Sequence, residues 1–439
     1  MVNKQMDRKD FLKSSAVAGV ALTMAPYILT GQDDRKANIA FIGVGSKGTS
    51  NLRVCLARGD VEVTHICDID KEAAARAEKL VTDAGQKKPR LYTRGAEDYL
   101  RMLEQGAGTI DGVIISTPWL WHTPMSVASM KAGMYAAPEV WGATTIDECW
   151  ELVNTSEETG MPCMMLENHC YDRDSMTILR MVREGLFGEL IHCQCGYQHD
   201  IRNGKTRLRT DGEVRWRIKH SITRNGDLYP THGLGPIANC LDDNRGNRMV
   251  SLTSTATKSR GLHNYIVEHG DENHPLANTK FALGDIVTSV VKTAREETIV
   301  INHDTNLPRP YTDMYRVQGT KGLWMEDGYQ IYIEGMSPKE HQWEPFEPYM
   351  EKYEHPLWQR HGGEGSHGGA DPLKNGAFVE CVKRKIPTPI DVYDTAAWIV
   401  VSPLSEQSIA QGNAPVEFPD FTKGKWKTNK PIFGLIGEY

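Results

Sequence analysis

Residues 38 to 70 contain a glycine-rich motif that strongly limits the possible folds. Four apolar residues, Ile39 to Ile42, form the short uninterrupted run that is typical of a strand buried in a parallel sheet. The complete G-x-G-x-x-G sequence Gly43-Val44-Gly45-Ser46-Lys47-Gly48 follows. The first glycine permits a tight turn, the second lets the backbone approach a pyrophosphate, and the third lets the next helix pack close to the strand. The motif predicts the strand, loop and helix that open a dinucleotide-binding domain.

An acidic residue in the right place strengthens this prediction. A second strand, Val61 to Cys67, ends at Asp68, twenty residues past the last glycine. A carboxylate there can accept hydrogen bonds from both ribose hydroxyls of NAD and would repel a 2′-phosphate. The pyrophosphate would lie on the helix N-terminus, which favours an anion. We therefore expect NAD as the cofactor, bound by Gly43, Gly45, Ser46, Lys47, Gly48 and Asp68.

The whole chain is that of an ordinary globular protein of two domains. Its 439 residues exceed a typical single domain. The net charge of −7 gives no reason to expect a nucleic acid or an anionic membrane as partner, and no apolar run after residue 30 is long enough to span a bilayer. The nine cysteines lack C-x-x-C spacing, which favours free buried thiols, and the histidines lack a zinc-binding pattern, so no metal is expected.

The first thirty residues predict an export signal. Arg8-Lys9-Asp10-Phe11-Leu12-Lys13 resembles the twin-arginine motif, with lysine in the second basic place, and an apolar run from Ala16 to Ala25 follows. The twin-arginine route exports folded proteins, which suits a protein whose NAD must be loaded in the cytoplasm. We expect residues 1–30 to direct a bacterial protein to the periplasm or otherwise to export it; the alternative is a disordered or helical N-terminal arm.

Strands and helices alternate between residues 36 and 168, which predicts a doubly wound parallel sheet. The expected elements include a helix from about Asp70 to Ala84, a strand from Asp111 to Ser116, and a strand from Met161 to Leu166. The helix from Thr144 to Thr159 should begin with a capping box of Thr145 and Glu148. Trp119 and His122 follow the strand that ends at Ser116, where ligands gather in open α/β sheets.

Past Glu167 the pattern changes to that of an α+β domain over residues 169–439. A helix from Asp174 to Glu184 precedes a series of runs that alternate apolar and polar residues, as in a mainly antiparallel sheet with one open face. These runs are Leu190–Tyr197, Val250–Ala256, Phe281–Thr293, Thr298–His303, Tyr315–Gly319, Leu323–Glu326 and Tyr329–Glu334. Two final helices are expected, Pro372–Lys383 and Thr395–Gln411, after a loop from His361 to Asp371.

This order of domains resembles the Gfo/Idh/MocA-type sugar oxidoreductases over nearly the whole chain from residue 36. That superfamily usually carries a Glu-Lys-Pro triplet after the fifth strand, whose lysine is the catalytic acid/base. Here the matching place reads Pro138-Glu139-Val140-Trp141, so the lysine is absent.

The NAD-dependent family 109 glycoside hydrolases also lack this lysine, and the chain is similar to them in several blocks. The blocks are Leu166-Glu167-Asn168-His169-Cys170-Tyr171, Gly185–Glu189, Gly196–Arg202, Asn225–Gly233, His303-Asp304-Thr305, Pro308–Tyr311 and Gly365-Ser366-His367-Gly368-Gly369. Family 109 implies a glycosidase, usually for α-N-acetylgalactosaminides, that uses recycled NAD: carbon 3 is oxidised, the aglycone is eliminated, water adds, and carbon 3 is reduced.

Such a reaction needs bases for the 3-hydroxyl and carbon 2, a donor to the ketone and an acid for the leaving group. His232 and Tyr229, three residues apart, would share a face if they open a helix, and are our candidates at carbon 3. Tyr171 is the candidate at carbon 2, and His367 the candidate for protons of the leaving group and water. The remaining candidates are sugar contacts, for which we name Arg202, Tyr311, Tyr171 and Tyr229, and cofactor contacts, for which we name Trp119, His122, Glu139 and Asn168.

Two other functions remain open at this point. One is an NAD-dependent sugar dehydrogenase that releases a keto-sugar, and the other is a non-catalytic sugar-binding Rossmann protein. The partner expected in each case is a glycoside, glycan or sugar, and the open face of the second sheet could pair with a second copy of the chain.

Overall fold

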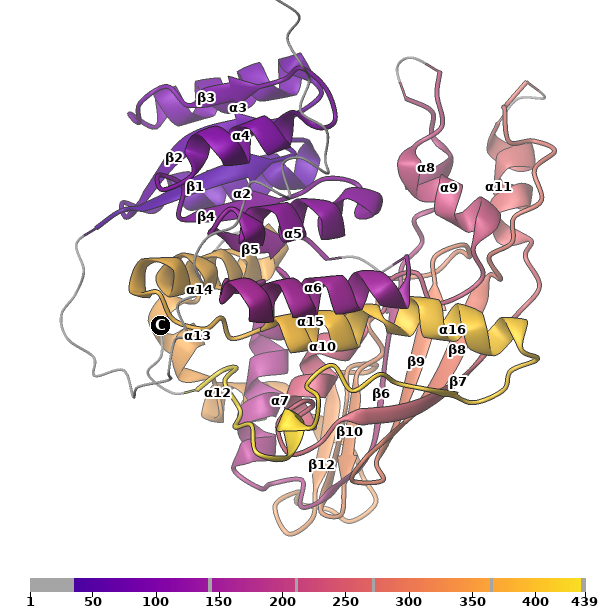
Figure 1. Cartoon of the computed structure of the whole chain (residues 1–439). Coiled ribbons are helices and arrows are strands. Elements are labelled where there is room, and N and C mark those ends of the chain that lie inside the picture. Colours follow the sequence, from indigo (N-terminus) through magenta and orange to yellow (C-terminus); the bar gives the residue numbers. More distant parts are fainter. Residues whose placement is uncertain (1–34, 141–143, 210–211, 271–272, 364–365, 436–439) are drawn as a thin grey trace, which may run out of the picture.

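The computed structural model describes residues 35–140, 144–209, 212–270, 273–363 and 366–435. The predicted signal at residues 1–30 and Trp141 lie outside this part of the chain. The first sheet has five parallel strands in the order β3-β2-β1-β4-β5. They are β1 (Ala37–Ile42), β2 (Val61–Cys67), β3 (Arg90–Tyr92), β4 (Gly112–Ile115) and β5 (Tyr135–Pro138). The doubly wound sheet expected from the sequence is therefore confirmed (Figure 1).

Helices cover both faces of this sheet and bury its apolar strands. They are α2 (Ser46–Leu56), α3 (Lys71–Asp83), α4 (Asp98–Gly106), α5 (His122–Lys131) and α6 (Ile146–Thr159), with a 3-10 turn at Trp119–Trp121 before α5. Ile39 and Phe41 belong to one apolar cluster and Ala40 and Ile42 to another, as a strand buried on both faces requires. The predicted capping box at Thr145 and Glu148 is confirmed.

The strand predicted from Met161 to Leu166 is wrong as a regular strand. The segment runs beside β5: Ala136 N donates to Pro162 O (3.0 Å), Met164 N to Ala136 O (2.9 Å) and Leu166 N to Pro138 O (2.8 Å). Only the bridge between Ala136 and Cys163 is formed. The next bond of a parallel ladder needs an amide hydrogen at residue 138, and proline has none.

The second sheet has nine strands in the order β13-β12-β11-β10-β6-β9-β8-β7-β14. Their bounds are β6 (Leu190–Gln198), β7 (Met249–Ala256), β8 (Ile286–Thr293), β9 (Thr298–Asp304), β10 (Arg316–Gly319), β11 (Gly322–Met325), β12 (Gln330–Ile333), β13 (Glu344–Pro345) and β14 (Val416–Glu417). All neighbours pair antiparallel except β6 and β9, which are parallel. The expected mainly antiparallel sheet is confirmed.

One face of this sheet packs on helices and the other is open, as Figure 1 shows. Helix α10 (Thr231–Cys240) contacts β6 and helix α16 (Val401–Ala410) contacts β7, while α15 (Val392–Ile399) contacts α10 and α6. Along β8, Val287 and Val291 are buried, while Val290 between them is 45% exposed. Burial therefore alternates along β8, but the residue types do not follow it strictly, because Ser289 is buried and the apolar Val290 lies on the open face.

The last predicted helix, Thr395–Gln411, is wrong as a single element, because α15 ends at Ile399 and α16 begins at Val401. Pro403 has no amide hydrogen to donate to the carbonyl of Ile399, so a continuous helix would leave that bond unmade. The other predicted helix is confirmed as α14 (Ala370–Arg384), and the helix after residue 172 as α7 (Arg173–Arg183).

Several short helices were missed. They are α8 (Arg202–Thr206), α9 (Trp216–Thr223), α11 (Gly261–His269), α12 (Glu347–Lys352) and α13 (Pro356–His361), with 3-10 turns at His169–Tyr171, Ser366–Gly369 and Lys425–Lys427. Residues of α9 and α11 bury a small apolar cluster of their own, which includes Ile218, Leu262 and Ile266. The largest apolar cluster, in contrast, contains residues of both sheets, so the two domains share a core.

Three chain-wide properties follow from the described residues. All nine cysteines are free and buried. Within the described ranges no helix is long and apolar enough to cross a membrane. The same ranges contain no group of three or more His, Cys, Asp or Glu side chains that could hold a metal ion.

Candidate active site

The glycine-rich loop has the geometry that its sequence predicts. Gly43 has φ +85°, and a side chain there would meet the backbone of Ser116 at 2.9 Å. A Cβ on Gly48 would lie 2.0 Å from the carbonyl oxygen of Gly43, so only glycine lets α2 start this close to β1. A Cβ on Gly45 would meet nothing within 4 Å, and no side chain caps the helix that begins at Ser46. The loop therefore leaves space and backbone donors for a pyrophosphate.

Asp68 is tied to this loop. Its Oδ2 accepts a hydrogen bond from Val44 N (2.7 Å) and its Oδ1 one from Asp70 N (2.8 Å). The carboxylate at the end of β2 is thereby fixed beside the glycine turn, where a ribose would lie. The loop and the carboxylate together fit NAD.

Lys47 and His367 meet beside the loop. Lys47 Nζ lies 3.0 Å from both carboxylate oxygens of Asp371 and 3.4 Å from His367 Nδ1. His367 Nδ1 is also 2.8 Å from Asp371 Oδ2, while its side chain is 48% exposed. His367 has φ +51° and is followed by Gly368 and Gly369 with φ +59° and +99°. The turn that precedes α14 thus holds the imidazole by one nitrogen at the edge of the glycine-rich loop.

Glu139, at the end of β5, lies in a buried polar group that crosses between the domains. Asn51 Nδ2 of α2 donates to Glu139 Oε1 (2.8 Å), and Lys374 Nζ of α14 lies 3.1 Å from the same oxygen. The sequence points to Glu139 and to the missing lysine at position 140, but not to Lys374. Only the fold brings that residue to this place.

Tyr229 and His232 lie together, as their spacing suggests. His232 is the second residue of α10 and Tyr229 lies just before the helix; their rings are 4.8 Å apart. Tyr197 of β6 lies 4.4 Å from Tyr229, and Trp119, after β4, lies 5.7 Å from it. The aromatic cluster therefore joins the carboxyl end of the parallel sheet to the second sheet.

A carboxylate that the sequence did not single out holds His232. Glu167 is fully buried, and its Oε1 lies 2.7 Å from His232 Nδ1. Burial lowers the pKa of His232 to about 4, against the opposing effect of Glu167. Burial alone would raise the pKa of Glu167, but His232 and His169 lower it to about 2. At neutral pH His232 is thus a neutral imidazole that donates its Nδ1 proton to a carboxylate.

His169 differs from His232 in its charge state. Its ring lies 4.2 Å from that of His232, and its Nδ1 lies 2.6 Å from Asp172 and 3.3 Å from Asp313. Burial alone would lower the pKa of His169, but the two carboxylates raise it to about 10. Tyr311, a predicted sugar contact, is 44% exposed and its hydroxyl lies 3.2 Å from His169 Nε2. His169 was missed, although it belongs to the quoted Glu-Asn-His block directly after the segment beside β5.

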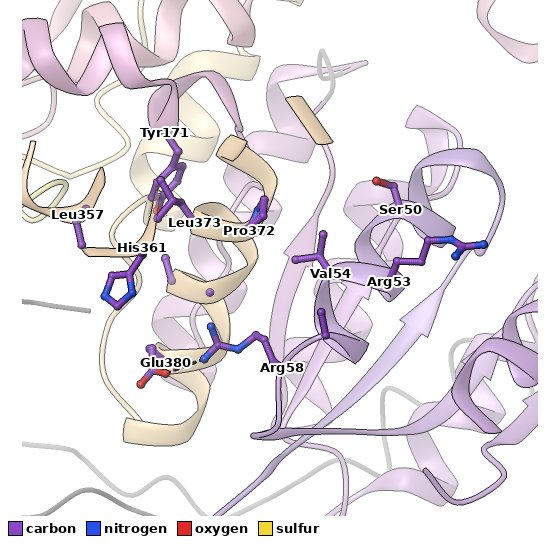
Figure 2. Close-up of a pocket in the computed structure, with 13 residues that line it drawn as sticks. Ser50, Arg53, Val54, Arg58, Tyr171, Leu357, His361, Pro372, Leu373 and Glu380 are labelled. Atoms are coloured by element: carbon purple, nitrogen blue, oxygen red, sulfur yellow. Dashed lines mark hydrogen bonds and ion pairs between the residues drawn. The ribbon is translucent and has the colours of Figure 1, made fainter. Parts of the chain in front are cut away.

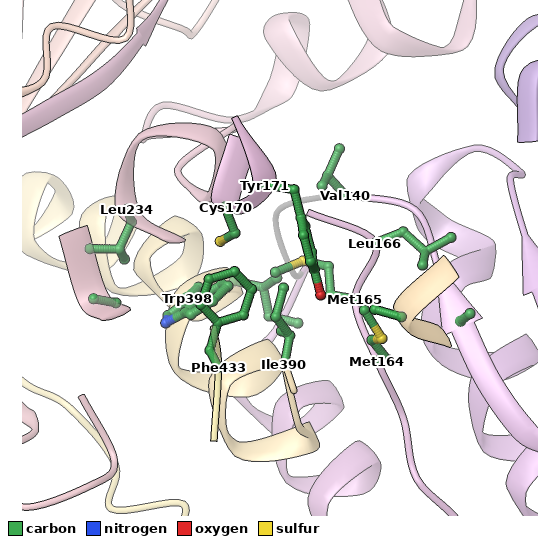
Figure 3. Packing of buried hydrophobic residues seen from close by; sticks show 14 of the residues in the cluster. Val140, Met164, Met165, Leu166, Cys170, Tyr171, Leu234, Ile390, Trp398 and Phe433 are labelled. Atoms are coloured by element: carbon green, nitrogen blue, oxygen red, sulfur yellow. The ribbon is translucent and has the colours of Figure 1, made fainter. Parts of the chain in front are cut away.

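Tyr171 lies in apolar surroundings that the sequence did not suggest. Its ring is 1% exposed and packs edge to face on Phe433 at 5.0 Å, among apolar side chains that include Met165 and Ile390 (Figure 3). Tyr171 lies in a 3-10 turn whose next residues lead into α7, which directs the ring into the shared core. This placement gives no support to Tyr171 as the base at carbon 2 or as a sugar contact.

Three further candidates differ in their surroundings. His122 is buried and its Nε2 lies 2.6 Å from the carbonyl oxygen of Thr117, which is a structural role. Arg202 forms a two-pronged ion pair with Asp200 (2.9 and 2.8 Å) and lies over the ring of Tyr265. Asn168 is 2% exposed, and its amide nitrogen has no hydrogen-bond partner among the described residues, so a donor is available to a ligand. The binding roles of all three stay predictions.

A cavity of about 620 Å³ lies between α2 and α14, and neither His232 nor His169 lines it (Figure 2). Its lining is mainly apolar, with the charged side chains Arg53, Arg58 and Glu380. Among the described residues that line it, Tyr171 is the only predicted site residue. The size of this cavity therefore does not mark it as the place of the chemistry.

Two known families match successive parts of the chain. Residues 171–428 match the family described as glycosyl hydrolase 109, C-terminal domain, and residues 37–167 match the oxidoreductase family with an NAD-binding Rossmann fold. An alpha-N-acetylgalactosaminidase of Tannerella forsythia is 48% identical over 92% of this chain and 90% of its own. A glycosyl hydrolase family 109 protein of Stenotrophomonas maltophilia is 46% identical over 99% of both chains.

Solved structures show the fold alone. Levoglucosan dehydrogenase in complex with NADH has a TM-score of 0.67 at 16% identity, over 88% of this chain and 100% of its own. An inositol dehydrogenase homolog from Azotobacter vinelandii, complexed with NADH and myo-inositol, has a TM-score of 0.63 at 15% identity, over 88% of this chain and 98% of its own.

Proposed function

The chain belongs to glycosyl hydrolase family 109, and we propose that it hydrolyses α-N-acetylgalactosaminides or closely related glycosides with a tightly bound NAD that is recycled in every turnover. It is an NAD-dependent glycoside hydrolase, as its resemblance to this family implied. The choice of sugar is supported by the name of the Tannerella forsythia relative. The observation that carries the proposed mechanism is the contact of a neutral and a charged histidine, His232 and His169.

His232 is the proposed base for the 3-hydroxyl of the sugar. Bound NAD supplies a hydride acceptor and later a hydride donor for carbon 3. Because Nδ1 of His232 donates to Glu167, the lone pair of Nε2 is available for a proton. Glu167 then stabilises the imidazolium that forms, in the way that a buried carboxylate supports a catalytic histidine. The same pair returns the proton when carbon 3 is reduced.

Tyr229 and His169 are the proposed stabilisers of negative charge at carbon 3. Burial and the neighbouring Tyr197 raise the pKa of Tyr229 well above its ordinary value, so the phenol keeps its proton and can donate to a ketone oxygen. The imidazolium of His169 adds a positive charge next to His232. A more polarised ketone makes the hydrogen on carbon 2 more acidic, which is what elimination requires.

His367 is the proposed acid for the leaving group. Asp371 occupies its Nδ1 and thereby fixes the imidazole at the edge of the glycine-rich loop, with half of the side chain exposed. An imidazole held by one nitrogen can exchange protons through the other. The same group can activate the water that adds after the aglycone has left.

We also propose export by the twin-arginine route, on the basis of Arg8, Lys9 and the apolar run from Ala16 to Ala25. Replacing Arg8 and Lys9 by alanine should keep active protein in the cytoplasm, measured by fractionation. Unchanged appearance in the periplasm would contradict the proposal.

A panel of nitrophenyl glycosides, followed together with the absorbance of NADH, tests the function. Purified protein with only the NAD it retains should release many equivalents of nitrophenol with no net NADH, and fastest from the α-N-acetylgalactosaminide. His232→Gln should slow release by about 10²–10⁴-fold, while His192→Gln, on the second sheet and bonded to Thr298, should not. NADH that accumulates in proportion to a keto-sugar would instead identify a dehydrogenase.

A further inference from the structure

Lys374 is a fully buried lysine that contacts two carboxylates and has no part in the mechanism above. Its Nζ lies 3.1 Å from Glu139 Oε1 and 3.0 Å from Asp371 Oδ1, and its side chain is 0% exposed. Placing an ammonium this deep is costly unless it is paired. Because burying the Lys374 ammonium group is costly, we expect this charge to have a role other than holding the two domains together.

Lys374 lies on a face of α14 that packs against the cofactor-binding domain. Asp371, Lys374 and Asn375 are spaced so that they share a face of the helix. Lys374 reaches Glu139 at the end of β5, and Asn375 Nδ2 donates to Asn51 Oδ1 of α2 (3.2 Å). Side chains of the second domain therefore contact α2, the helix that starts at the glycine-rich loop, and Glu139 at the end of β5.

The surroundings of Lys374 and Glu139 favour the charged form of each. Burial alone would lower the pKa of Lys374, but Glu139 and Asp371 raise it above its ordinary value. Burial alone would raise the pKa of Glu139, but Lys374, Lys47 and Asn51 lower it. Lys47 also contacts Asp371, and burial together with Lys374 lowers the pKa of Lys47, so two basic side chains face two acidic ones in the cluster.

The cluster lies on the side of the sheet where the nicotinamide half of NAD belongs. Ligands of such sheets cross the carboxyl ends of the strands at the point where the strand order reverses, here between β1 and β4. Asp68, which fits the adenosine ribose, ends β2 on one side of that point. Glu139 ends β5 on the other side, beyond the strand that leads to Trp119.

We propose that the buried ion pair of Lys374 and Glu139 sets the relative affinity of the protein for oxidised and reduced NAD. The nicotinamide ring carries one positive charge when oxidised and none when reduced, so a nearby carboxylate favours the oxidised form and a nearby ammonium favours the reduced form. A balanced pair favours neither strongly. Such balance suits the proposed recycling, on which this reading of its purpose rests, because carbon 3 must be oxidised and reduced in one turnover.

Competition between the two forms of the cofactor tests the proposal without any glycoside. Holoenzyme is equilibrated with equal concentrations of NAD⁺ and NADH, freed of unbound nucleotide and denatured, and the released forms are quantified by chromatography. Lys374→Met should shift the retained ratio towards NAD⁺ by about tenfold, since it removes the cation that contacts Glu139, and Glu139→Gln should shift it towards NADH by a similar factor. The double variant, which removes both charges, should return close to the wild-type ratio.

Lys383→Met is the matched control. Lys383 lies on the same helix and pairs with Asp60 (3.0 Å), which precedes β2 at the opposite end of the sheet, so its loss should leave the ratio unchanged. Shifts of both single variants in the same direction, or no shift in either, would overturn the proposal. If Lys374→Met retains no cofactor, the other two variants still test the proposal. Glu139→Gln should shift the retained ratio towards NADH, and the double variant should return it close to the wild-type ratio. Because no sugar is present, a failure of the glycosidase proposal leaves this result unaffected.

Discussion

His232 and His169 show how two identical side chains in contact can take different charge states. His232 faces one buried carboxylate, Glu167, and burial keeps it neutral. His169 faces Asp172 and Asp313, whose combined charge outweighs burial. Environments that drive two pKa values apart are typical of sites that divide acid and base roles. The difference in charge between His232 and His169 depends on the side chains around each ring, so substitutions of single residues can test it.

Activity should depend on the protonation of His232. With its pKa at about 4, the base is lost only as the pH falls through that value, so kcat/KM should stay level from pH 8 to about 5 and then fall. His232→Gln should lower kcat by about 10²–10⁴-fold. Rates on a nitrophenyl glycoside between pH 3.5 and 8 measure both. An acid limb near pH 6.5 would show that the imidazole is not desolvated as described.

His169 should stabilise the fold in a defined pH range. Its pKa is raised from 6.5 to about 10, so its contribution is complete below pH 6.5 and is lost as the pH rises through about 10. His169→Gln should therefore cost about 3 kcal/mol of unfolding free energy at pH 6 and progressively less towards pH 10. Denaturant unfolding at several pH values measures this, with His192→Gln as control. A cost that is independent of pH would contradict the charged state of His169.

At the scale of elements, the turn Ser366–Gly369 should matter most for poor leaving groups. His367→Ala should slow hydrolysis of a natural glycan by about 10²–10⁴-fold and that of a nitrophenyl glycoside far less, because nitrophenolate leaves without an acid. Asp371→Asn should have the same pattern with a smaller effect, since Asp371 holds His367. His232→Gln should slow both substrates alike. Equal losses on both substrates for His367→Ala would leave His367 a residue that shapes the loop.

Elements with local signals were predictable from the sequence, and those that depend on distant partners were not. The G-x-G-x-x-G loop and the capping box at Thr145 act within a few residues. Pro138 and Pro403 interrupt a predicted strand and a predicted helix through a missing amide hydrogen, which an apolar pattern does not reveal. The burial of the Tyr171 ring against Phe433 and Met165 could not be predicted, because neither partner belongs to the sequence block that drew attention to Tyr171.

The dependence on distant partners also explains which residues of the candidate site could be predicted from the sequence. His232 and Tyr229 could be found because they lie three residues apart. Lys374 and Asp371 could not be assigned to Glu139 and Lys47, since more than two hundred residues separate each pair and only the packing of α14 on α2 brings them together.

For the molecule as a whole, cofactor choice follows from one carboxylate. Asp68 is fixed to the glycine-rich loop through Val44 and would oppose a 2′-phosphate with like charge. Wild-type protein should therefore retain NAD in preference to NADP, and Asp68→Ala should lower the NAD content of purified protein. Nucleotide released on denaturation measures both. Tighter binding of NADP by the wild type would contradict this assignment.

The central claim is that this glycosidase works by oxidation and elimination, and hydrogen exchange at carbon 2 tests it most directly. The glycoside is hydrolysed in deuterium oxide by protein that holds only its retained NAD, and the product sugar is analysed by NMR and mass spectrometry. Elimination removes the hydrogen of carbon 2 and the later addition of water replaces it from solvent, so the account predicts one deuterium on carbon 2 and none on carbon 3, where the hydride returns. A product that keeps its original hydrogen on carbon 2 would contradict the account and indicate a direct displacement at carbon 1.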